Sequence, residues 1–402
     1  MSRAVWFSMY IELINRSPDL TRLLNEGYEI DESNGFLLIN HVPYVNANKQ
    51  VMYGTLVSRL TISNNTTLRP NDHIALWIGE YPCDYNGSQL TNLVINTNSE
   101  QIREGLVTTH TFSQKPQEGY YEDYYQKMTQ YVHMLDGHAH AIQPEATATT
   151  FPVIKLTPEE SVFCYIDSAS SRAGITFINE KLKKTRIAIV GLGGTGSYVL
   201  DLVSKTSVEE IHLFDGDMFL QHNAFRSPGA PSSDDLAKRP TKVGWFSESY
   251  SRMRRKIIPH HQFMDETNVT ALRHVDFVFL CLDKGGSKRM IMTYLIENNI
   301  KFIDVGMGLR NVDNALTGSV RLTTFTPSYH DHMTDRISFN DEEDNVYSTN
   351  IQIADLNALN AALAVVKWKK MFGVYHDFTK EHHAVYQVST NVISNEEIPD
   401  ET

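Results

Sequence analysis

The chain has 402 residues, enough for two domains, and its 41% hydrophobic and 21% charged content is ordinary for a soluble globular protein. Its net charge of −12 argues against nucleic-acid binding, and no apolar run reaches the ~18 residues of a membrane span. Its three cysteines lack paired spacing, which argues against a disulfide framework. We therefore expect a cytoplasmic protein with neither nucleic-acid nor membrane partners.

Residues 1–150 are predicted to form a smaller α+β domain. Helical patterns occur within residues 1–25 and 120–135, and the second of these is rich in tyrosine. Strands are expected at residues 35–40, 51–62 and 73–79. Small residues at 145–150 then mark a domain boundary. We interpret the tyrosines as core or interface residues rather than as a cofactor site.

Each of two features of this first domain can be interpreted either as a chemical site or as part of the structure only. Cys83 is either a nucleophile or thiol carrier, or a loop cysteine without chemistry. The histidines at 133, 138 and 140 are either metal ligands or solvated residues, and no cysteine or acid pair completes a ligand set. We favour the structural interpretation in both cases, which leaves partner binding as the candidate role of this domain.

A nucleotide-binding pattern opens at residue 186, inside a second domain predicted over residues 151–395. Residues 186–190 form an apolar strand, a glycine turn and a helix follow, and a second strand at 210–214 ends on Asp215. The glycines let the backbone approach a phosphate, and the helix N-terminus offers it free N–H groups. The acid at the strand end is placed for a ribose hydroxyl. This pattern alone suits NAD, FAD or ATP.

Polar residues downstream of the turn narrow the choice of nucleotide. They are Asp217, Asn223 and Arg226, then Lys242 after an Arg-Pro pair, and Asp283 at the end of a third apolar strand at 275–282. In this order they resemble the ThiF/MoeB and ubiquitin-activating-enzyme superfamily of adenylating proteins, in its bacterial type, over about residues 172–373. Phe219 stands where that pattern has valine.

The resemblance implies an α/β fold: a Rossmann-like ThiF-type adenylation domain with a mixed sheet, here preceded by an extra N-terminal domain. It implies ATP and Mg²⁺ as cofactors. It also implies that the C-terminal carboxylate of a ubiquitin-like or sulfur-carrier-like protein ending in glycine is adenylated, with release of pyrophosphate. A conjugating enzyme is a further candidate partner. We expect a homodimer through residues 186–372, because the family pairs these domains and a long apolar helix at 351–372 needs a partner surface.

The family's nucleotide-binding and catalytic positions transfer residue by residue. They fall on Gly191, Gly193, Gly194, Gly196, Asp215, Asp217, Asn223, Arg226, Lys242 and Asp283. The resemblance implies that Arg226 and Lys242 neutralise phosphate charge and that Asp283 holds Mg²⁺. Arg172, shortly before the first strand, is the candidate for the arginine that reaches ATP across a dimer interface. The structural alternative makes these residues surface charges and turn caps.

Cysteine usage departs from the family pattern. The distal part has no Cys-x-x-Cys pair, so we predict no structural zinc. No cysteine follows Asp283, and Cys281 is predicted to be buried inside the third strand, so we expect an acyl-adenylate without an obligatory thioester on this chain. A covalent ester would fall on a hydroxyl near the crossing loop at 329–347. The candidates are Thr324, Thr326 and Ser328, with His330 or His332 as the base.

The remaining elements complete the expected sheet. They are a helix at 285–299 and strands at 300–305, 317–325 and 384–392, the last two antiparallel or edge strands. Two other functions stay open. An NAD-dependent oxidoreductase would use Asp215 equally well, but it gives Arg226 and Lys242 no obvious role. A catalytically inactive adaptor would keep the fold only to bind a ubiquitin-like protein.

Overall fold

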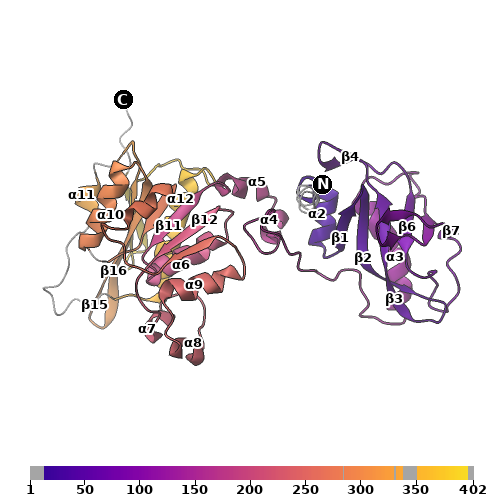
Figure 1. Cartoon of the computed structure of the whole chain (residues 1–402), viewed down its shortest axis with the longest axis horizontal. Coiled ribbons are helices and arrows are strands. Elements are labelled where there is room, and N and C mark those ends of the chain that lie inside the picture. Colours follow the sequence, from indigo (N-terminus) through magenta and orange to yellow (C-terminus); the bar gives the residue numbers. More distant parts are fainter. Residues whose placement is uncertain (1–12, 284, 330–331, 338–350, 397–402) are drawn as a thin grey trace. The chain divides into compact units, whose positions relative to one another are not determined.

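The chain forms two compact units in the computed structural model, which describes residues 13–283, 285–329, 332–337 and 351–396 (Figure 1). The first unit comprises Met1–Ser161 and Tyr165–Thr176, and the second comprises Val162–Cys164 and Phe177–Thr402. The small-residue run at 145–150 lies within the first unit. None of the described helices is long and apolar enough to cross a membrane.

The first unit is built on an antiparallel six-stranded sheet. Its strands, in spatial order, are β1 (Glu29–Ser33), β2 (Phe36–Val45), β3 (Val51–Arg59), β6 (Ile74–Ile78), β10 (His110–Ser113) and β7 (Val94–Asn96). Two small hairpins pair β4 (Ile62–Ser63) with β5 (Thr66–Thr67) and β8 (Gln101–Arg103) with β9 (Leu106–Val107). The helices are α2 (Pro18–Asn25), α3 (Tyr124–His140) and α4 (Ser168–Arg172). The predicted α+β class of this domain is confirmed.

Side-chain size decides how the first sheet packs. The indole of Trp77 lies over Gly54 of β3, where a Cβ would stand 2.3 Å from the ring, so only glycine fits there. Trp77 is fully buried and stacks on Phe112 with ring centroids 5.6 Å apart. Helix α3 packs on β2 and β3 and covers this aromatic core.

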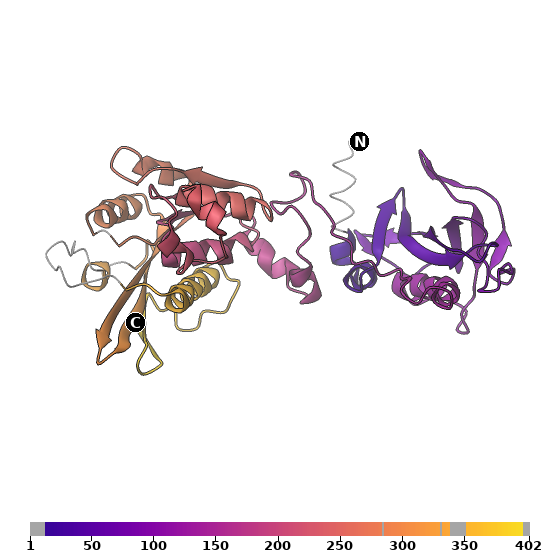
Figure 2. The ribbon, with the colours of Figure 1, turned by 90° about the horizontal axis from the view of Figure 1, so that it is seen from below.

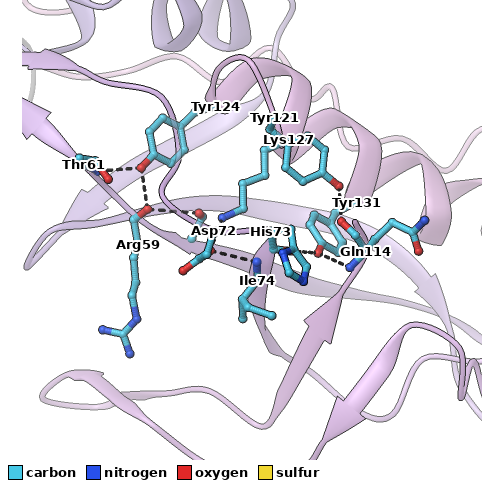
Figure 3. A network of polar contacts seen from close by, with 11 residues as sticks. Arg59, Thr61, Asp72, His73, Ile74, Gln114, Tyr121, Tyr124, Lys127 and Tyr131 are labelled. Carbon is cyan, nitrogen blue, oxygen red and sulfur yellow. Dashed lines mark hydrogen bonds and ion pairs between the residues drawn. The ribbon is translucent and has the colours of Figure 1, made fainter. Parts of the chain in front are cut away.

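Tyrosine hydroxyls of α3 hold the ends of strands and loops in the first unit (Figure 3). The Tyr124 hydroxyl donates to the Arg59 carbonyl at 2.8 Å and accepts from the Thr61 amide at 2.7 Å. The Tyr131 hydroxyl donates to the carbonyl of His73. Both rings are fully buried, which confirms that these tyrosines are core residues. Their hydroxyls satisfy backbone groups that would otherwise lack partners.

The second unit is built on a mixed sheet of eight strands. In spatial order they are β13 (Ile257–His260), β12 (Glu210–Phe214), β11 (Arg186–Val190), β14 (Phe277–Leu280), β15 (Lys301–Val312), β16 (Ala315–Phe325), β17 (His383–Gln387) and β18 (Val392–Glu396). The first five are parallel and the last three are antiparallel to their neighbours. The predicted Rossmann-like mixed sheet is confirmed, and the single strand expected at 384–392 is the hairpin of β17 and β18.

Helices cover both faces of this sheet (Figure 2). One face packs on α6 (Gly194–Ser204), α9 (Lys242–Ser251) and α12 (Ala354–Met371), and the other on η2 (Val269–His274) and α10 (Gly285–Glu297). Successive residues of β11 serve opposite faces: Ile187 and Ile189 face α6, and Ala188 and Val190 face α10. The shorter helices are α5 (Thr176–Asn179), η1 (Glu180–Leu182), α7 (Gln221–Ala224), α8 (Ser233–Ala237) and α11 (Met333–Arg336).

Helix α12 (Ala354–Met371) buries most of its apolar residues within its own unit. It packs beside α6 and against β15 and β16, and Trp368 is fully buried in that core. Packing within the unit thus accounts for most of the apolar character of this helix, while Val366 is exposed, and the homodimer stays a prediction.

The carboxyl ends of the parallel strands lie together at one edge of the sheet. Strand order reverses at β11: α6, which leads from β11 to β12, lies on one face of the sheet, and η2, which leads from β13 to β14, lies on the other. In sheets of this kind, ligands bind outside the carboxyl ends of the strands at the point of reversal. That edge carries the glycine turn after β11 and the acids after β12 and β14.

Candidate nucleotide site

Two glycines of the turn are required by protein packing. Gly191 has a φ of +90°, and a Cβ there would lie 2.5 Å from the Cys281 carbonyl oxygen. At Gly196 a Cβ would lie 1.9 Å from the Gly191 carbonyl oxygen. The turn after β11 therefore closes tightly against the end of β14, and neither position accepts a larger residue without movement of the backbone.

The two glycines between them have different surroundings. A Cβ at Gly194 would lie 2.0 Å from the side-chain nitrogen of Asn357, so this glycine makes room for α12. A Cβ at Gly193, the N-cap of α6, would meet no atom of the described residues within 4 Å. Since the first N–H groups of α6 have no partner within the helix, this open position suits an anion such as a phosphate.

Asp215 holds the turn in place. Its carboxylate is 7% exposed and accepts hydrogen bonds from the Leu192 amide at 2.7 Å and the Asp217 amide at 2.8 Å. Lys242, the first residue of α9, places its Nζ 3.4 Å from Asp215 and 2.7 Å from Asp217. The lysine thus neutralises two acids, and its own position is fixed by them.

Asp217 is the more accessible acid at this edge. Its side chain is 54% exposed, whereas that of Asp215 is 7% exposed. The carboxylate of Asp217 therefore has room to accept hydroxyl groups from a ligand. The sequence assigned the ribose to Asp215, and that assignment stays a prediction.

Arg226 brings a buried and unsatisfied donor to the site. Its Nε is buried and has no hydrogen-bond partner in the part of the chain that the structure describes. An unpartnered buried N–H of a charged group is costly, so an anion is the expected partner for this guanidinium. Asn223, 3% exposed, accepts from the Leu220 amide at 2.9 Å and so shapes α7, which leads into Arg226.

Asn357 is a site residue that the sequence did not reveal. It lies near the start of α12, is 1% exposed, and accepts a hydrogen bond from the Thr195 hydroxyl at 3.0 Å. Its amide nitrogen donates to the Arg226 carbonyl at 3.4 Å. One side chain therefore joins the glycine turn to the segment that carries Arg226. An asparagine inside an otherwise apolar helical run was the available signal.

Replacing Asn357 with leucine is expected to weaken ATP binding about tenfold or more, because the turn and Arg226 lose their common anchor. The unfolding free energy should fall by about 1–3 kcal/mol, the usual loss when buried partners are left unsatisfied. Calorimetry and urea unfolding measure the two effects.

Asn360→Leu is the matched control for this prediction. Asn360 is also 1% exposed and on α12, but it donates to the Gly306 carbonyl at 3.1 Å. It should lose similar stability and keep its nucleotide affinity. Equal losses of affinity in the two variants would remove Asn357 from the site.

Asp283 follows the end of β14 and is exposed to solvent. The Gln352 side-chain amide donates to its carboxylate at 3.0 Å. Among the described residues, no group of three or more His, Cys, Asp or Glu side chains could hold a metal ion. Mg²⁺ is commonly bound by one or two carboxylates together with substrate phosphates, so a single aspartate at this edge fits such an ion. The metal role of Asp283 and the absence of zinc both stay predictions.

Arg172 lies in the first unit, at the end of α4. Its guanidinium donates to the Asn25 carbonyl at 2.6 Å, beside the end of α2. Its predicted role at the nucleotide of a second copy stays a prediction.

Cys281 lies outside the strand in which the sequence placed it. Strand β14 ends at Leu280, and Cys281 is the next residue and is half-buried rather than fully buried. Burial of its thiol, with a smaller contribution from Asp304, still raises its pKa well above the ordinary value. In the first unit, burial raises the pKa of the Cys83 thiol as well. Neither cysteine is therefore an activated thiolate.

The predicted ester acceptors lie away from the nucleotide edge. Strand β16 runs antiparallel to β15, and its last residue, Phe325, pairs with Phe302 near the start of β15. Thr324 and Thr326 are thus near the edge where the parallel strands begin, away from the glycine turn, which does not favour them as acceptors of an acyl group from the nucleotide edge. His382 at 3.1 Å, and not His332, is the imidazole bonded to the Thr326 hydroxyl. His330 and most of the loop at 329–347 lie outside the described residues.

Family models match nearly the whole chain. Residues 18–168 match a domain of unknown function (DUF6791), and residues 169–396, more than half of the chain, match the ThiF family. The first match falls on the N-terminal sheet unit and the second on the unit with the glycine turn.

Known proteins similar to this chain share low identity with it. The ubiquitin-like modifier-activating enzyme 5 of Drosophila mojavensis is 24% identical over 164 residues, which is 38% of this chain and 40% of that protein. The enzyme of the same name from Gallus gallus is 26% identical over 167 residues, 38% of this chain and 41% of that protein. The chain thus spans about two fifths of the length of these relatives. The crystal structure of E. coli MccB with ATP has a TM-score of 0.46 and 17% identity, covering 57% of this chain and 71% of that one.

Proposed function

The chain belongs to the ThiF family, and from this premise we propose that it adenylates the C-terminal carboxylate of a small protein at the expense of ATP. In this reaction a carboxylate oxygen bonds to the α-phosphorus of ATP while the bond to the β-phosphate oxygen breaks. Pyrophosphate leaves, and the acyl-adenylate remains. No side chain of the enzyme becomes covalently modified in this step, so catalysis consists of positioning and charge neutralisation.

The observation that carries this proposal is the combination of an open helix N-terminus and an unsatisfied cation. Gly193 leaves space in front of α6, and Arg226 presents a buried Nε without a partner among the described residues. Together they offer backbone N–H groups and a guanidinium to a phosphate chain. Lys242 adds a positive charge at the same edge, held by Asp215 and Asp217.

The other site residues have complementary roles in this proposal. Asp217, whose side chain is 54% exposed, accepts ribose hydroxyls, and Asp215 keeps the turn closed through its bond to the Leu192 amide. Asp283 would hold Mg²⁺, which when bound shields the charge of the leaving pyrophosphate. Asn357 fixes the turn relative to Arg226.

The substrate we propose is a ubiquitin-like or sulfur-carrier-like protein with a C-terminal glycine. The support is the name of the low-identity relatives, which are ubiquitin-like modifier-activating enzymes. A conjugating enzyme as a second partner and cytoplasmic action belong to the same proposal. The homodimer also stays a proposal, with Arg172 as the residue that would serve the second copy. A monomer in light scattering at micromolar concentration would refute that pairing.

An NAD-dependent oxidoreductase is the competing interpretation of the glycine turn. In such enzymes the acid at the end of the second strand binds the ribose. Here both oxygens of Asp215 already accept backbone N–H groups, at 2.7 and 2.8 Å. Calorimetric titration with ATP-Mg and, separately, with NADH distinguishes the two functions: we expect binding of ATP and none of NADH. Tight NADH binding with no binding of ATP would contradict the proposal. An inactive adaptor would bind neither nucleotide.

A chain without cysteines is expected to keep its activity. Substituting serine for Cys83, Cys164 and Cys281 should leave pyrophosphate release within about twofold of wild type, because the adenylation step uses no thiol, and the raised pKa values of the Cys83 and Cys281 thiols leave little thiolate there for acyl transfer. The measurement is pyrophosphate release with the partner protein and ATP, followed by electrophoresis without reductant. A reducible adduct on the wild-type chain that one substitution abolishes would show a cysteine carrier instead.

A further inference from the structure

A cavity lies in the ThiF unit, away from the nucleotide edge. It has a volume of about 280 Å³, is open to solvent, and is lined by the end of β16, the last turns of α12 and residues 377–382. Its lining residues are Lys301, Thr324, Thr326, Ser328, Tyr329, Lys367, Met371, Asp377, Lys380 and His382. Lys301 begins β15, whereas Asp304 pairs with Leu280 at the end of β14. The cavity therefore opens where the parallel strands start, and the nucleotide edge is where they end.

The cavity carries an excess of positive charge. Three lysines line it against a single acid, Asp377. The charge of Asp377 is already matched, because the Lys367 Nζ lies 2.9 Å from its carboxylate. Lys301 and Lys380 are exposed and form no ion pair with any described residue. In a chain with a net charge of −12, such a local excess of cations favours an anionic ligand.

A buried hydroxyl in the cavity wall lacks a partner. Thr324 is 0% exposed, and its Oγ1 has no hydrogen bond to any described residue. Its amide is used, since it donates to the His382 carbonyl at 2.7 Å. Buried hydroxyls in native proteins are normally satisfied, so this one has its proton available for an acceptor bound in the cavity.

The imidazole opposite is held in one tautomer. His382 Nδ1 donates to the Lys380 carbonyl at 2.9 Å, so Nε2 is the acceptor for the Thr326 hydroxyl at 3.1 Å. This pair forms a fixed polar wall. The ring of Tyr329 and the side chain of Met371 supply the apolar part of the lining.

We propose that this cavity binds a small phosphate-bearing organic molecule. Its phosphate would lie between Lys301 and Lys380 and accept the proton of the Thr324 hydroxyl, and its organic part would pack on Tyr329 and Met371. The site is separate from the nucleotide edge and does not depend on the adenylation reaction.

The test is calorimetric titration of the full-length chain with phenyl phosphate, which combines a phosphate with an aromatic ring. Binding should be saturable in wild type and unchanged in Arg226→Ala, which lacks the phosphate-binding arginine of the nucleotide edge. Lys301→Ala and Thr324→Val should each weaken it tenfold or more. Thr324→Val removes the unsatisfied hydroxyl at nearly constant volume, so it should unfold no more readily than wild type.

Two matched variants complete the experiment. Lys184→Ala removes one exposed lysine elsewhere in the same unit and should leave the affinity unchanged. Thr323→Val removes the neighbouring hydroxyl, which lies 3.0 Å from His383 Nδ1, so it should lower stability without changing affinity. Absence of binding to wild type, loss of binding in Arg226→Ala, or wild-type affinity in Lys301→Ala and Thr324→Val would each overturn the proposal.

Discussion

Replacing Arg226 with alanine is expected to reduce ATP-dependent AMP formation by ~10³-fold or more, the range of oriented arginines in phosphoryl transfer. The free energy of unfolding should change little, because the buried Nε makes no hydrogen bond with the described residues. Its removal therefore leaves no other buried polar group without a partner. The backbone carbonyl that Asn357 contacts is retained in the variant. AMP release and urea unfolding measure the two quantities.

The control for this variant is Arg252→Ala. Arg252 is exposed at the end of α9, so its substitution removes the same charge from the same unit without touching the turn. Its activity should equal that of wild type. Wild-type turnover in Arg226→Ala would exclude this residue from the phosphate site.

Substituting alanine at Gly193 and at Gly196 is expected to separate binding from folding. At Gly193 the backbone φ is −70°, which alanine adopts, and the added methyl group meets no atom of the described residues within 4 Å. This variant should fold with a stability within about 1 kcal/mol of wild type. Its methyl group would occupy the approach to the N-terminus of α6, so ATP affinity should fall about tenfold or more, equivalent to ~1.4 kcal/mol.

At Gly196 we expect the substitution to lower the stability of the fold first, rather than the ATP affinity. The added methyl group would lie 1.9 Å from the Gly191 carbonyl oxygen, so the backbone of the turn must move. Overpacking of this kind costs about 1–3 kcal/mol or more, and the variant should unfold at lower urea concentration. Calorimetry and urea unfolding of both variants test the pair. Unchanged ATP affinity in Gly193→Ala would place the phosphates elsewhere.

The elements that the sequence predicted well are those with a strong local signal. The apolar runs of β11, β12 and β14 and the glycines between them predict a buried parallel sheet with a nucleotide turn, and the structure confirms that fold. The sequence predicted strands that are too short for the hairpin of β15 and β16. Its outer part is mostly exposed and lacks apolar alternation, so only backbone pairing marks it as strand. Asp313 and Asn314, both at positive φ, form its turn and were the available signal.

The parts of the site that escaped prediction depend on contacts between distant segments. Asn357 meets Thr195 across 162 positions, and nothing local in α12 indicates that the helix end packs on the turn. The structural role of Asp215 also escaped prediction, because its oxygens accept hydrogen bonds from backbone amides only once the turn has folded. The displacement of Thr324 and Thr326 from the nucleotide edge follows from strand direction, which single-segment patterns do not encode.

The most direct test of the central claim is Mg²⁺-dependent exchange of labelled pyrophosphate into ATP. The purified chain is incubated with ATP, labelled pyrophosphate and small β-grasp proteins ending in glycine, with Arg226→Ala as the inactive control. The account predicts exchange that requires one such protein, that stops when its C-terminal glycine is removed, and that fails in the control. No exchange with any of these proteins, together with tight binding of NADH, would contradict it.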